Sequence, residues 1–245
     1  MRLKDKVAVV TGAGSGFGAG IARRFSEEGA TVIVADIDAA AGEKIAREVE
    51  GRFVRADVTR GDDWANLLRA AGAKLDIIVN NAGWTHRKKP YVEVTEAEFD
   101  RVYAVNVKSI YLSALHAVPL FRKRGGGCFV NIASTAGLRP RPGLTVYNSS
   151  KGAVITMSKS MAAEFGPERI RVNCVNPVFS PDTSLSADFA GGALTEEAKE
   201  RFLATIPLGR FSSPLDVANA CLYLASDEAA FISGVCIEVD GARCV

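Results

Sequence analysis

The chain has few of the residues that bind metals or form disulfides. Two histidines and five cysteines occur among its 245 residues, and no two cysteines form a Cys-x-x-Cys pair. Widely spread cysteines favour buried thiols in a reducing compartment over disulfides. Because His86 has no cysteine or carboxylate at ligand spacing, we expect no metal site.

An excess of charge of one sign is also missing. Thirty Lys and Arg residues face twenty-eight Asp and Glu residues, so we expect neither a nucleic acid nor a membrane surface as partner. The N-terminus shows no signal-peptide core, and no apolar run approaches the roughly 20 residues that span a bilayer. These absences favour a cytoplasmic protein.

Short apolar runs alternate with longer helical patterns along the whole chain, as in parallel strands joined by crossover helices. The runs are β-branched and lack polar alternation, which is typical of strands covered on both faces. We therefore predict a single α/β domain over residues 1–245, with a doubly wound, Rossmann-type parallel sheet and helices on both faces. The expected strands are 7–10, 31–35, 52–56, 75–79, 128–132, 171–175 and 236–239, and the expected helices lie near 17–28, 39–49, 62–72, 96–123, 146–165, 195–204 and 215–225.

Two segments depart from this pattern. The helix expected over 96–123 carries apolar residues on more than one face, among them Val102, Val105 and Leu115, and this surplus predicts a subunit interface. Residues 178–194 are irregular and rich in Ser, Ala, Gly and Pro. With the helix that follows, they predict a substrate lid over about 178–204.

A glycine-rich turn, Thr11-Gly12-Ala13-Gly14-Ser15-Gly16-Phe17-Gly18, follows the first expected strand and leads into a helix. Glycines let the backbone turn tightly and approach a pyrophosphate, and the helix N-terminus offers free N–H groups to the phosphates. The alternative is an ordinary flexible turn. The strand-turn-helix context favours a dinucleotide site.

Asp36 ends the next expected strand, about 20 residues beyond the glycines, where such folds recognise the adenosine ribose. A carboxylate there accepts hydrogen bonds from both ribose hydroxyls and repels a 2′-phosphate. Neither Ser15 nor Ile37 supplies a cation to reverse this choice. The cofactor is therefore predicted to be NAD, although Asp36 has a second possible role as a helix N-cap.

Tyr147 and Lys151 lie four residues apart in a segment with helical periodicity, so both side chains share one face. A neighbouring ammonium and a cationic nicotinamide would lower the pKa of the phenol and allow Tyr147 to exchange the proton of an alcohol. Alone, such a pair is more often a plain surface contact. Ser134, at the end of a strand, is placed to hold the substrate oxygen.

With these motifs in this order, the sequence resembles the short-chain dehydrogenase/reductase family, in its compact single-domain branch, over essentially the whole chain. The resemblance implies strand order 3-2-1-4-5-6-7, a homotetramer or dimer, and catalysis by Ser134, Tyr147, Lys151 and Asn106, with Asn106 holding a water in a proton relay through Lys151. It also implies that Asp57 and Val58 contact the adenine. The complete cofactor site is then Gly12, Ser15, Gly16, Phe17, Gly18, Asp36, Ile37, Asp57, Val58, Asn80, Ala82, Gly83, Tyr147, Lys151, Pro177, Ser180 and Thr183.

One departure from the family pattern follows the sixth expected strand. Where the family has Pro-Gly, this chain has Pro177-Val178, and Thr183 lies one position later than in the commonest spacing. Pro177 is expected to keep its role beside the nicotinamide. Whether Ser180 or Thr183 meets the carboxamide stays open.

The expected function is hydride transfer between NAD and a secondary alcohol or carbonyl of a small polar substrate, which is anionic, polyol-like or sugar-like. Arg139 and Arg141 are candidate ligands for an anionic group, although loop cations are more often simply solvated. Trp84 and Phe179 are candidates for an apolar wall. A 3-oxoacyl carrier-protein reductase is the nearest alternative, against which Asp36 counts because those enzymes typically use NADPH. A non-catalytic dinucleotide-binding scaffold or sensor is the alternative of another class.

Overall fold

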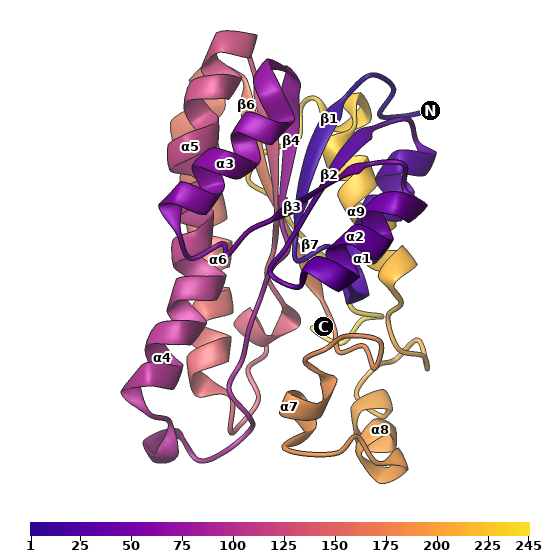
Figure 1. The fold of residues 1–245 in the computed structure, drawn as a ribbon. Helices are drawn as coiled ribbons and strands as arrows, with labels where there is room; N and C mark the ends of the chain where they lie inside the picture. The colour runs from indigo at the N-terminus through magenta and orange to yellow at the C-terminus, as the bar shows by residue number, and fades with distance from the viewer.

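The strands of the chain form one parallel sheet. The computed structural model describes residues 1–245, and all six pairs of neighbouring strands are parallel. Their order, β3-β2-β1-β4-β5-β6-β7, is the predicted one and confirms the doubly wound fold (Figure 1). The strands are β1 (Val7–Thr11), β2 (Thr31–Asp36), β3 (Arg52–Arg55), β4 (Leu75–Asn80), β5 (Gly127–Ile132), β6 (Ile170–Pro177) and β7 (Cys236–Val239).

Helices cover both faces of this sheet. Ala8 and Val10 of β1 pack toward α1 and α9, whereas Val9 packs toward the helices of the opposite face. All three residues are fully buried, which explains why the strands show no polar alternation. The helices are α1 (Gly16–Glu27), α2 (Ala39–Glu48), α3 (Gly61–Ala71), α4 (Glu96–Tyr103), α5 (Ser109–Arg124), α6 (Thr145–Phe165), α7 (Ser186–Ala190), α8 (Glu196–Leu203) and α9 (Pro214–Ala225).

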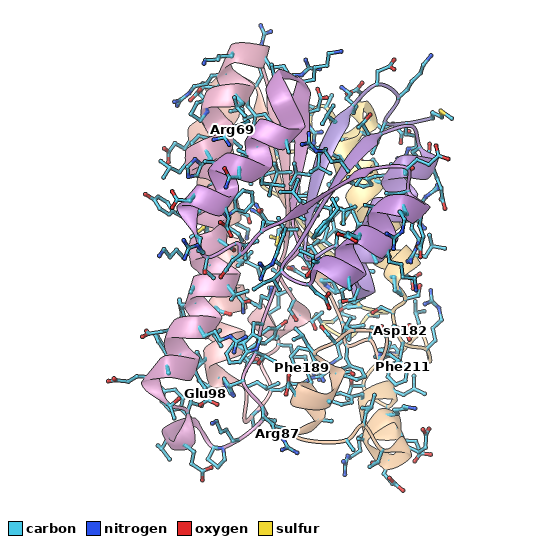
Figure 2. All side chains as sticks on the ribbon, in the orientation of Figure 1. Arg69, Arg87, Glu98, Asp182, Phe189 and Phe211 are labelled. Atoms are coloured by element: carbon cyan, nitrogen blue, oxygen red, sulfur yellow. The ribbon has the colours of Figure 1, made fainter.

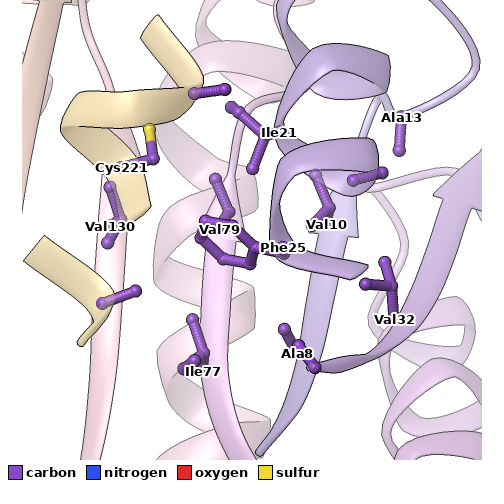
Figure 3. Close-up of a cluster of buried hydrophobic side chains, with 14 of the residues drawn as sticks. Ala8, Val10, Ala13, Ile21, Phe25, Val32, Ile77, Val79, Val130 and Cys221 are labelled. Atoms are coloured by element: carbon purple, nitrogen blue, oxygen red, sulfur yellow. The ribbon is translucent and has the colours of Figure 1, made fainter. Parts of the chain in front are cut away.

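The core under α1 anchors the glycine turn. Phe25 of α1 lies beside Val79 of β4 and faces the sheet, close to Ile21 one turn earlier in the same helix (Figure 3). Removing such a buried ring typically costs about 3–5 kcal/mol, so α1 is held firmly against the sheet. Cys221 of α9 belongs to the same cluster, and all five cysteines are free thiols, as predicted.

The long helix predicted over 96–123 is interrupted. A wider π-helical turn, Ala104–Lys108, separates α4 from α5 and contains Asn106. By length and composition alone, Glu96–Arg124 as a whole could cross a membrane, although charged residues interrupt it. Half of its most apolar window is nevertheless buried inside the protein, as expected for a core helix packed on a sheet.

Residues that follow β6 lie beyond the carboxyl end of the sheet, where Figure 1 shows α7 and α8 set apart from the other helices. The helix predicted near 195–204 is α8, whereas the short α7 was not predicted. A small apolar cluster of Val178, Phe179 and Ile206 ties this region to the end of β6, with Phe189, Phe202 and Phe211 packed against it.

Candidate active site

A cleft of about 350 Å³ opens at the carboxyl end of the sheet, where doubly wound folds bind their ligands. Loops that follow β1, β4, β5 and β6 line it. Four residues predicted for the site, Gly18, Asn80, Asn106 and Arg139, are not part of the lining. The cleft brings together the other predicted residues, Gly12, Ser15, Gly16, Phe17, Asp36, Ile37, Asp57, Val58, Ala82, Gly83, Trp84, Ser134, Arg141, Tyr147, Lys151, Pro177, Phe179, Ser180 and Thr183.

The glycine turn packs too tightly for side chains. Gly12 has a φ of +61°, and a Cβ on Gly18 would lie 2.1 Å from the Gly12 carbonyl oxygen. Gly18 therefore holds α1 against the turn and does not face the cleft. Ser15 precedes α1 without capping it by its side chain, so the first N–H groups of the helix are left for a ligand.

Asp36 is aimed at this turn. Its Oδ2 accepts a hydrogen bond from the Gly14 backbone N–H at 2.8 Å, and its Oδ1 accepts one from the Asp38 N–H at 3.0 Å. The N-cap of α2 is Asp38, whose side chain accepts from the Ala41 N–H, so Asp36 does not have the alternative capping role. Its carboxylate lines the cleft beside Ile37.

Asn80 and Asn81 hold the loop after β4 in place. The amide of Asn80 is buried and donates to Ser113 Oγ at 3.0 Å and to Asn131 Oδ1 at 2.8 Å, which links β4 to α5 and β5. Asn81 was not predicted as a site residue, yet it lines the cleft and donates to the Thr11 and Gly12 carbonyl oxygens. The signal was present in the sequence, because both asparagines follow the same strand.

Tyr147 and Lys151 lie one turn apart on α6 and both are buried. The Lys151 Nζ lies 5.7 Å from the centroid of the Tyr147 ring and donates to the Ile132 carbonyl oxygen at 2.8 Å. Ser134 follows β5 and accepts from the Ala136 N–H at 3.1 Å. All three side chains line the same part of the cleft.

Burial controls the ionisation of this pair. It raises the pKa of Tyr147 to about 12, opposed by the Ser134 hydroxyl and the charge of Arg141. It also lowers the pKa of Lys151 to about 8. Desolvation disfavours both charged forms in the protein alone, and the predicted lowering of the Tyr147 pKa by Lys151 together with a cationic nicotinamide stays a prediction.

Asn106 lies in the π-helical turn and binds the loop after β4. Its Oδ1 accepts from the Trp84 N–H at 2.8 Å, and its Nδ2 donates to the Trp84 carbonyl oxygen and to Ser150 Oγ, both at 2.9 Å. Its side chain is thus fully engaged with the protein. Turns of this kind often occur at functional sites, and the predicted role in a water relay stays a prediction.

Aromatic and cationic side chains line the end of the cleft near α7 and α8. Phe189 of α7 meets the Tyr147 ring edge-on at 5.1 Å, and Phe179 meets the Phe189 ring edge-on at 6.4 Å. The guanidinium of Arg101 lies 4.3 Å from the centroid of the Trp84 ring. Arg101 and Phe189 escaped prediction because one lies among many charges of a surface helix and the other in a segment without a clear pattern.

The fold, together with a Ser, a Tyr and a Lys gathered at the carboxyl edge of the sheet, defines a Rossmann-type oxidoreductase. The chain belongs to the short-chain dehydrogenase/reductase family, as the motifs predicted. A family model described as enoyl-(acyl carrier protein) reductase matches residues 12–242.

Several relatives match along nearly their whole length. The 4-formylbenzenesulfonate dehydrogenase of Comamonas testosteroni is 51% identical over 99% of both chains. The 3-oxoacyl-[acyl-carrier-protein] reductase of Thermotoga maritima is 38% identical over 98% of both chains. The crystal structure of a 3-ketoacyl-(acyl-carrier-protein) reductase from Brucella melitensis, complexed with NADH, is 39% identical, covers 99% of this chain and 100% of its own, and superposes with a TM-score of 0.93.

Proposed function

We propose that the protein is an NAD-dependent dehydrogenase that transfers a hydride between NAD and the oxygen-bearing carbon of a small aromatic or cyclic alcohol or carbonyl compound. One observation carries this proposal. Ser134, Tyr147 and Lys151 line the same cleft as the glycine turn and Asp36. Relatives named for 4-formylbenzenesulfonate and for a dichlorocyclohexadienediol support a ring-shaped substrate.

The cleft fits a dinucleotide without a 2′-phosphate. The turn at Gly12 leaves no space for side chains, and the free N–H groups at the start of α1 suit a pyrophosphate. Asp36 lines the cleft where the ribose would bind, and its negative charge disfavours a further phosphate. NADH in the related Brucella melitensis structure supports this choice.

The chain's own residues would handle the proton and the orientation of the substrate. When bound by the glycine turn and Asp36, NAD would supply the acceptor for the hydride that leaves the carbinol carbon in oxidation. Tyr147 takes the hydroxyl proton as the C=O bond forms, and in reduction it returns that proton. Ser134 holds the reacting oxygen of the substrate beside Tyr147. The Lys151 ammonium, together with the positively charged nicotinamide ring of bound NAD, would favour the phenolate form of Tyr147.

The aromatic rings around the cleft support a substrate with a flat apolar body. Phe179 and Phe189 lie at the end of the cleft that also contains Tyr147, and Trp84 belongs to the same lining. We also propose that residues 178–204 act as a lid of the single domain. In support, a Cβ on Gly16 would lie 3.5 Å from the Thr183 Cα, so this segment already reaches over the glycine turn.

A 3-oxoacyl carrier-protein reductase is the second candidate, because the Thermotoga maritima and Brucella melitensis relatives have that name. The two candidates differ in cofactor and substrate. Comparing NAD(H) with NADP(H), each with benzyl alcohol and with an acetoacetyl thioester, separates them. Preference for NADPH and the thioester would reject the dehydrogenase.

Replacing Tyr147 by Phe tests the proposed mechanism. Loss of a positioned acid or base costs about 10²–10⁴-fold in rate, so we expect kcat for benzyl alcohol oxidation to fall by that factor. Binding of NADH, followed by its fluorescence, should persist because the rest of the cleft is intact. Full activity in Tyr147→Phe would refute the proton role, and absence of turnover with every alcohol, polyol, sugar and hydroxy acid tried would favour a scaffold or sensor.

We propose, finally, that the enzyme works in the cytoplasm as a homotetramer or dimer. Exposed apolar residues on α4 and α5, namely Phe99, Tyr111 and Leu115, support an interface on that face.

A further inference from the structure

Three arginines lie near one another without an ion pair, and Asp240 is the carboxylate whose charge acts on Arg243. Arg139 and Arg141 lie in the loop before α6, and Arg243 lies in the C-terminal tail after β7. None of the three belongs to an ion pair. Arg243 is the charge that acts most strongly on Arg141, and Arg139 acts on both.

The tail is folded so that Arg243 is held in place. The Asp240 carboxylate accepts hydrogen bonds from the Ala242 N–H at 2.9 Å and the Cys244 N–H at 2.8 Å. Ala242 has a φ of +70°, an unusual conformation for a residue other than glycine. Arg139 then donates from Nη1 to the Arg243 carbonyl oxygen, which ties the tail to the loop that contains Arg141.

Arg243 is buried but incompletely satisfied. Its exposed fraction is 6%, and its Nε and Nη1 atoms are buried without a hydrogen-bond partner. A buried guanidinium without an anion is costly, and a second cation nearby adds to that cost. An anion bound next to these arginines would therefore stabilise the folded protein. The guanidinium group of arginine suits a planar or tetrahedral oxyanion.

Arg141 connects this charge to the cleft. It lines the cleft, its guanidinium lies 4.7 Å from the centroid of the Phe202 ring, and its backbone carbonyl accepts from Asn148 Nδ2 at 2.8 Å. Asn148 follows Tyr147 directly in α6, so the catalytic tyrosine and the arginine loop are held together. A substrate whose carbinol group reaches Tyr147 therefore lies in the same cleft as the positive charge of Arg141.

We propose that Arg141 binds an anionic group, a sulfonate or a carboxylate, carried on the ring of the substrate at the end opposite the reacting carbon, and that Arg243, which does not line the cleft, adds its positive charge to this site. This inference rests on the proposed function and specifies its substrate class. Arg139 is then a positioning residue, because its guanidinium holds the backbone of Arg243 and does not line the cleft. The sequence predicted Arg139 as a direct ligand of the substrate, and we assign it this positioning role instead.

Steady-state kinetics with three alcohols tests the proposal: 4-(hydroxymethyl)benzenesulfonate, 4-(hydroxymethyl)benzoate and benzyl alcohol. Loss of one member of a buried charge pair costs about 2 kcal/mol or more, so Arg141→Gln should lower kcat/KM for the anionic alcohols by about 30-fold or more, mainly through KM. Arg243→Gln should lower it by less, because Arg243 does not line the cleft and acts only through its charge. Benzyl alcohol should lose clearly less, because it carries no anion and is affected only through the charge that Arg141 exerts on Tyr147. Arg69→Gln, on exposed α3 at the opposite end of the molecule (Figure 2), is the control and should change neither.

Two further variants guard against misfolding. Arg243→Lys keeps a positive charge and should retain part of the preference for the sulfonate, which a purely structural defect would not. Arg139→Gln should raise KM for the sulfonate more than KM for benzyl alcohol, and Arg139→Lys, which keeps a donor, should restore KM for the sulfonate.

Calorimetry of benzenesulfonate binding to the NADH-loaded protein separates the two proposals. If wild-type protein oxidises benzyl alcohol but the arginine variants bind benzenesulfonate as tightly as wild type, the anion site is refuted and the dehydrogenase stands. If no alcohol is oxidised while benzenesulfonate binding depends on Arg141 and Arg243, the dehydrogenase is refuted and the anion site stands. Equal losses for neutral and anionic alcohols would also overturn the anion site.

Discussion

Lys151 shows how burial and function oppose each other in one residue. Its ammonium is buried beside Tyr147, and this burial lowers its pKa from the ordinary 10.5 to about 8. Between those two values, the unfolded chain holds a proton at Lys151 that the folded chain does not. The free energy of unfolding therefore rises with pH across this window.

Replacing Lys151 by Met should remove that dependence. A shift from 10.5 to about 8 corresponds to about 3 kcal/mol, so the variant should be more stable than wild type near neutral pH, by up to that amount. The difference in the free energy of unfolding between the variant and the wild type should shrink to almost nothing at pH 10.5. Urea unfolding at several pH values measures it, with the exposed Lys4→Met as the matched control. An unchanged pH slope in Lys151→Met would mean that the ammonium is well solvated.

Residues of the site were predictable where the fold dictates their spacing. Tyr147 and Lys151 must lie four apart to share a helical face, and Asp36 must end the second strand to reach the ribose. No spacing or motif in the sequence indicated Arg243. Its charge acts on Arg141 from a tail that Asp240 folds back and that Arg139 holds through the Arg243 carbonyl oxygen, and such long-range contacts leave no pattern in a single sequence.

At the scale of single elements, the turn between β1 and α1 leaves very little space for side chains. A Cβ on Gly18 would lie 2.1 Å from the Gly12 carbonyl oxygen, so Gly18→Ala must displace either the turn or the helix. We expect a loss of stability of about 3 kcal/mol and much weaker NADH binding, measured by thermal unfolding and NADH fluorescence.

Gly152→Ala is the matched control for this prediction. Gly152 lies inside α6, where a Cβ would contact only the Gly137 carbonyl oxygen at an ordinary 3.8 Å. Alanine favours a helix interior by about 1 kcal/mol over glycine, so this variant should be slightly more stable and should bind NADH as wild type does. Normal NADH binding by Gly18→Ala would show that the turn is more tolerant than its geometry indicates.

The regular elements were predicted well because their patterns are local. All seven strands begin within one residue of their predicted starts, since buried strands are short apolar runs bounded by polar residues. The π-helical turn at Ala104–Lys108 was missed. It interrupts a helix whose apolar periodicity continues across it, and it is stabilised by tertiary contacts of Asn106 with Trp84 and Ser150.

The whole molecule leaves an apolar stripe without a partner. Phe99, Tyr103, Val107, Tyr111 and Leu115 recur every four residues along α4 and α5, and Tyr111 and Leu115 are 55% and 53% exposed. Contiguous exposed apolar residues on a folded protein usually mark an interface. The other apolar residues of the predicted surplus, such as Val102 and Ile110, face the core instead.

Replacing Leu115 by Glu should therefore lower the oligomeric state. A charge buried in a symmetric interface is repeated in both subunits, so its cost is doubled. Size-exclusion chromatography with light scattering gives the mass directly. Val92→Glu, at another exposed apolar position, should leave the mass unchanged. A wild-type mass in Leu115→Glu, or a monomeric wild type, would remove this face as the interface.

The strand order was predicted from the resemblance to the short-chain dehydrogenase/reductase family, and the alternating strands and helices predicted only that the sheet is parallel. The substrate did not follow, because the side chains proposed to contact it come from distant segments of the chain: the loop after β4, the loop before α6, and α7. Fold alone does not name a substrate.

The transfer of a labelled hydride tests the central claim most directly. An alcohol deuterated at its carbinol carbon, 4-(hydroxymethyl)benzenesulfonate or benzyl alcohol, is oxidised by the protein with NAD, and the reduced dinucleotide is analysed by mass spectrometry. The account predicts that deuterium appears in the NADH formed and that Tyr147→Phe slows this transfer by about 10²–10⁴-fold. Unlabelled NADH, or label transferred only to NADPH when NADP is supplied instead, would contradict it.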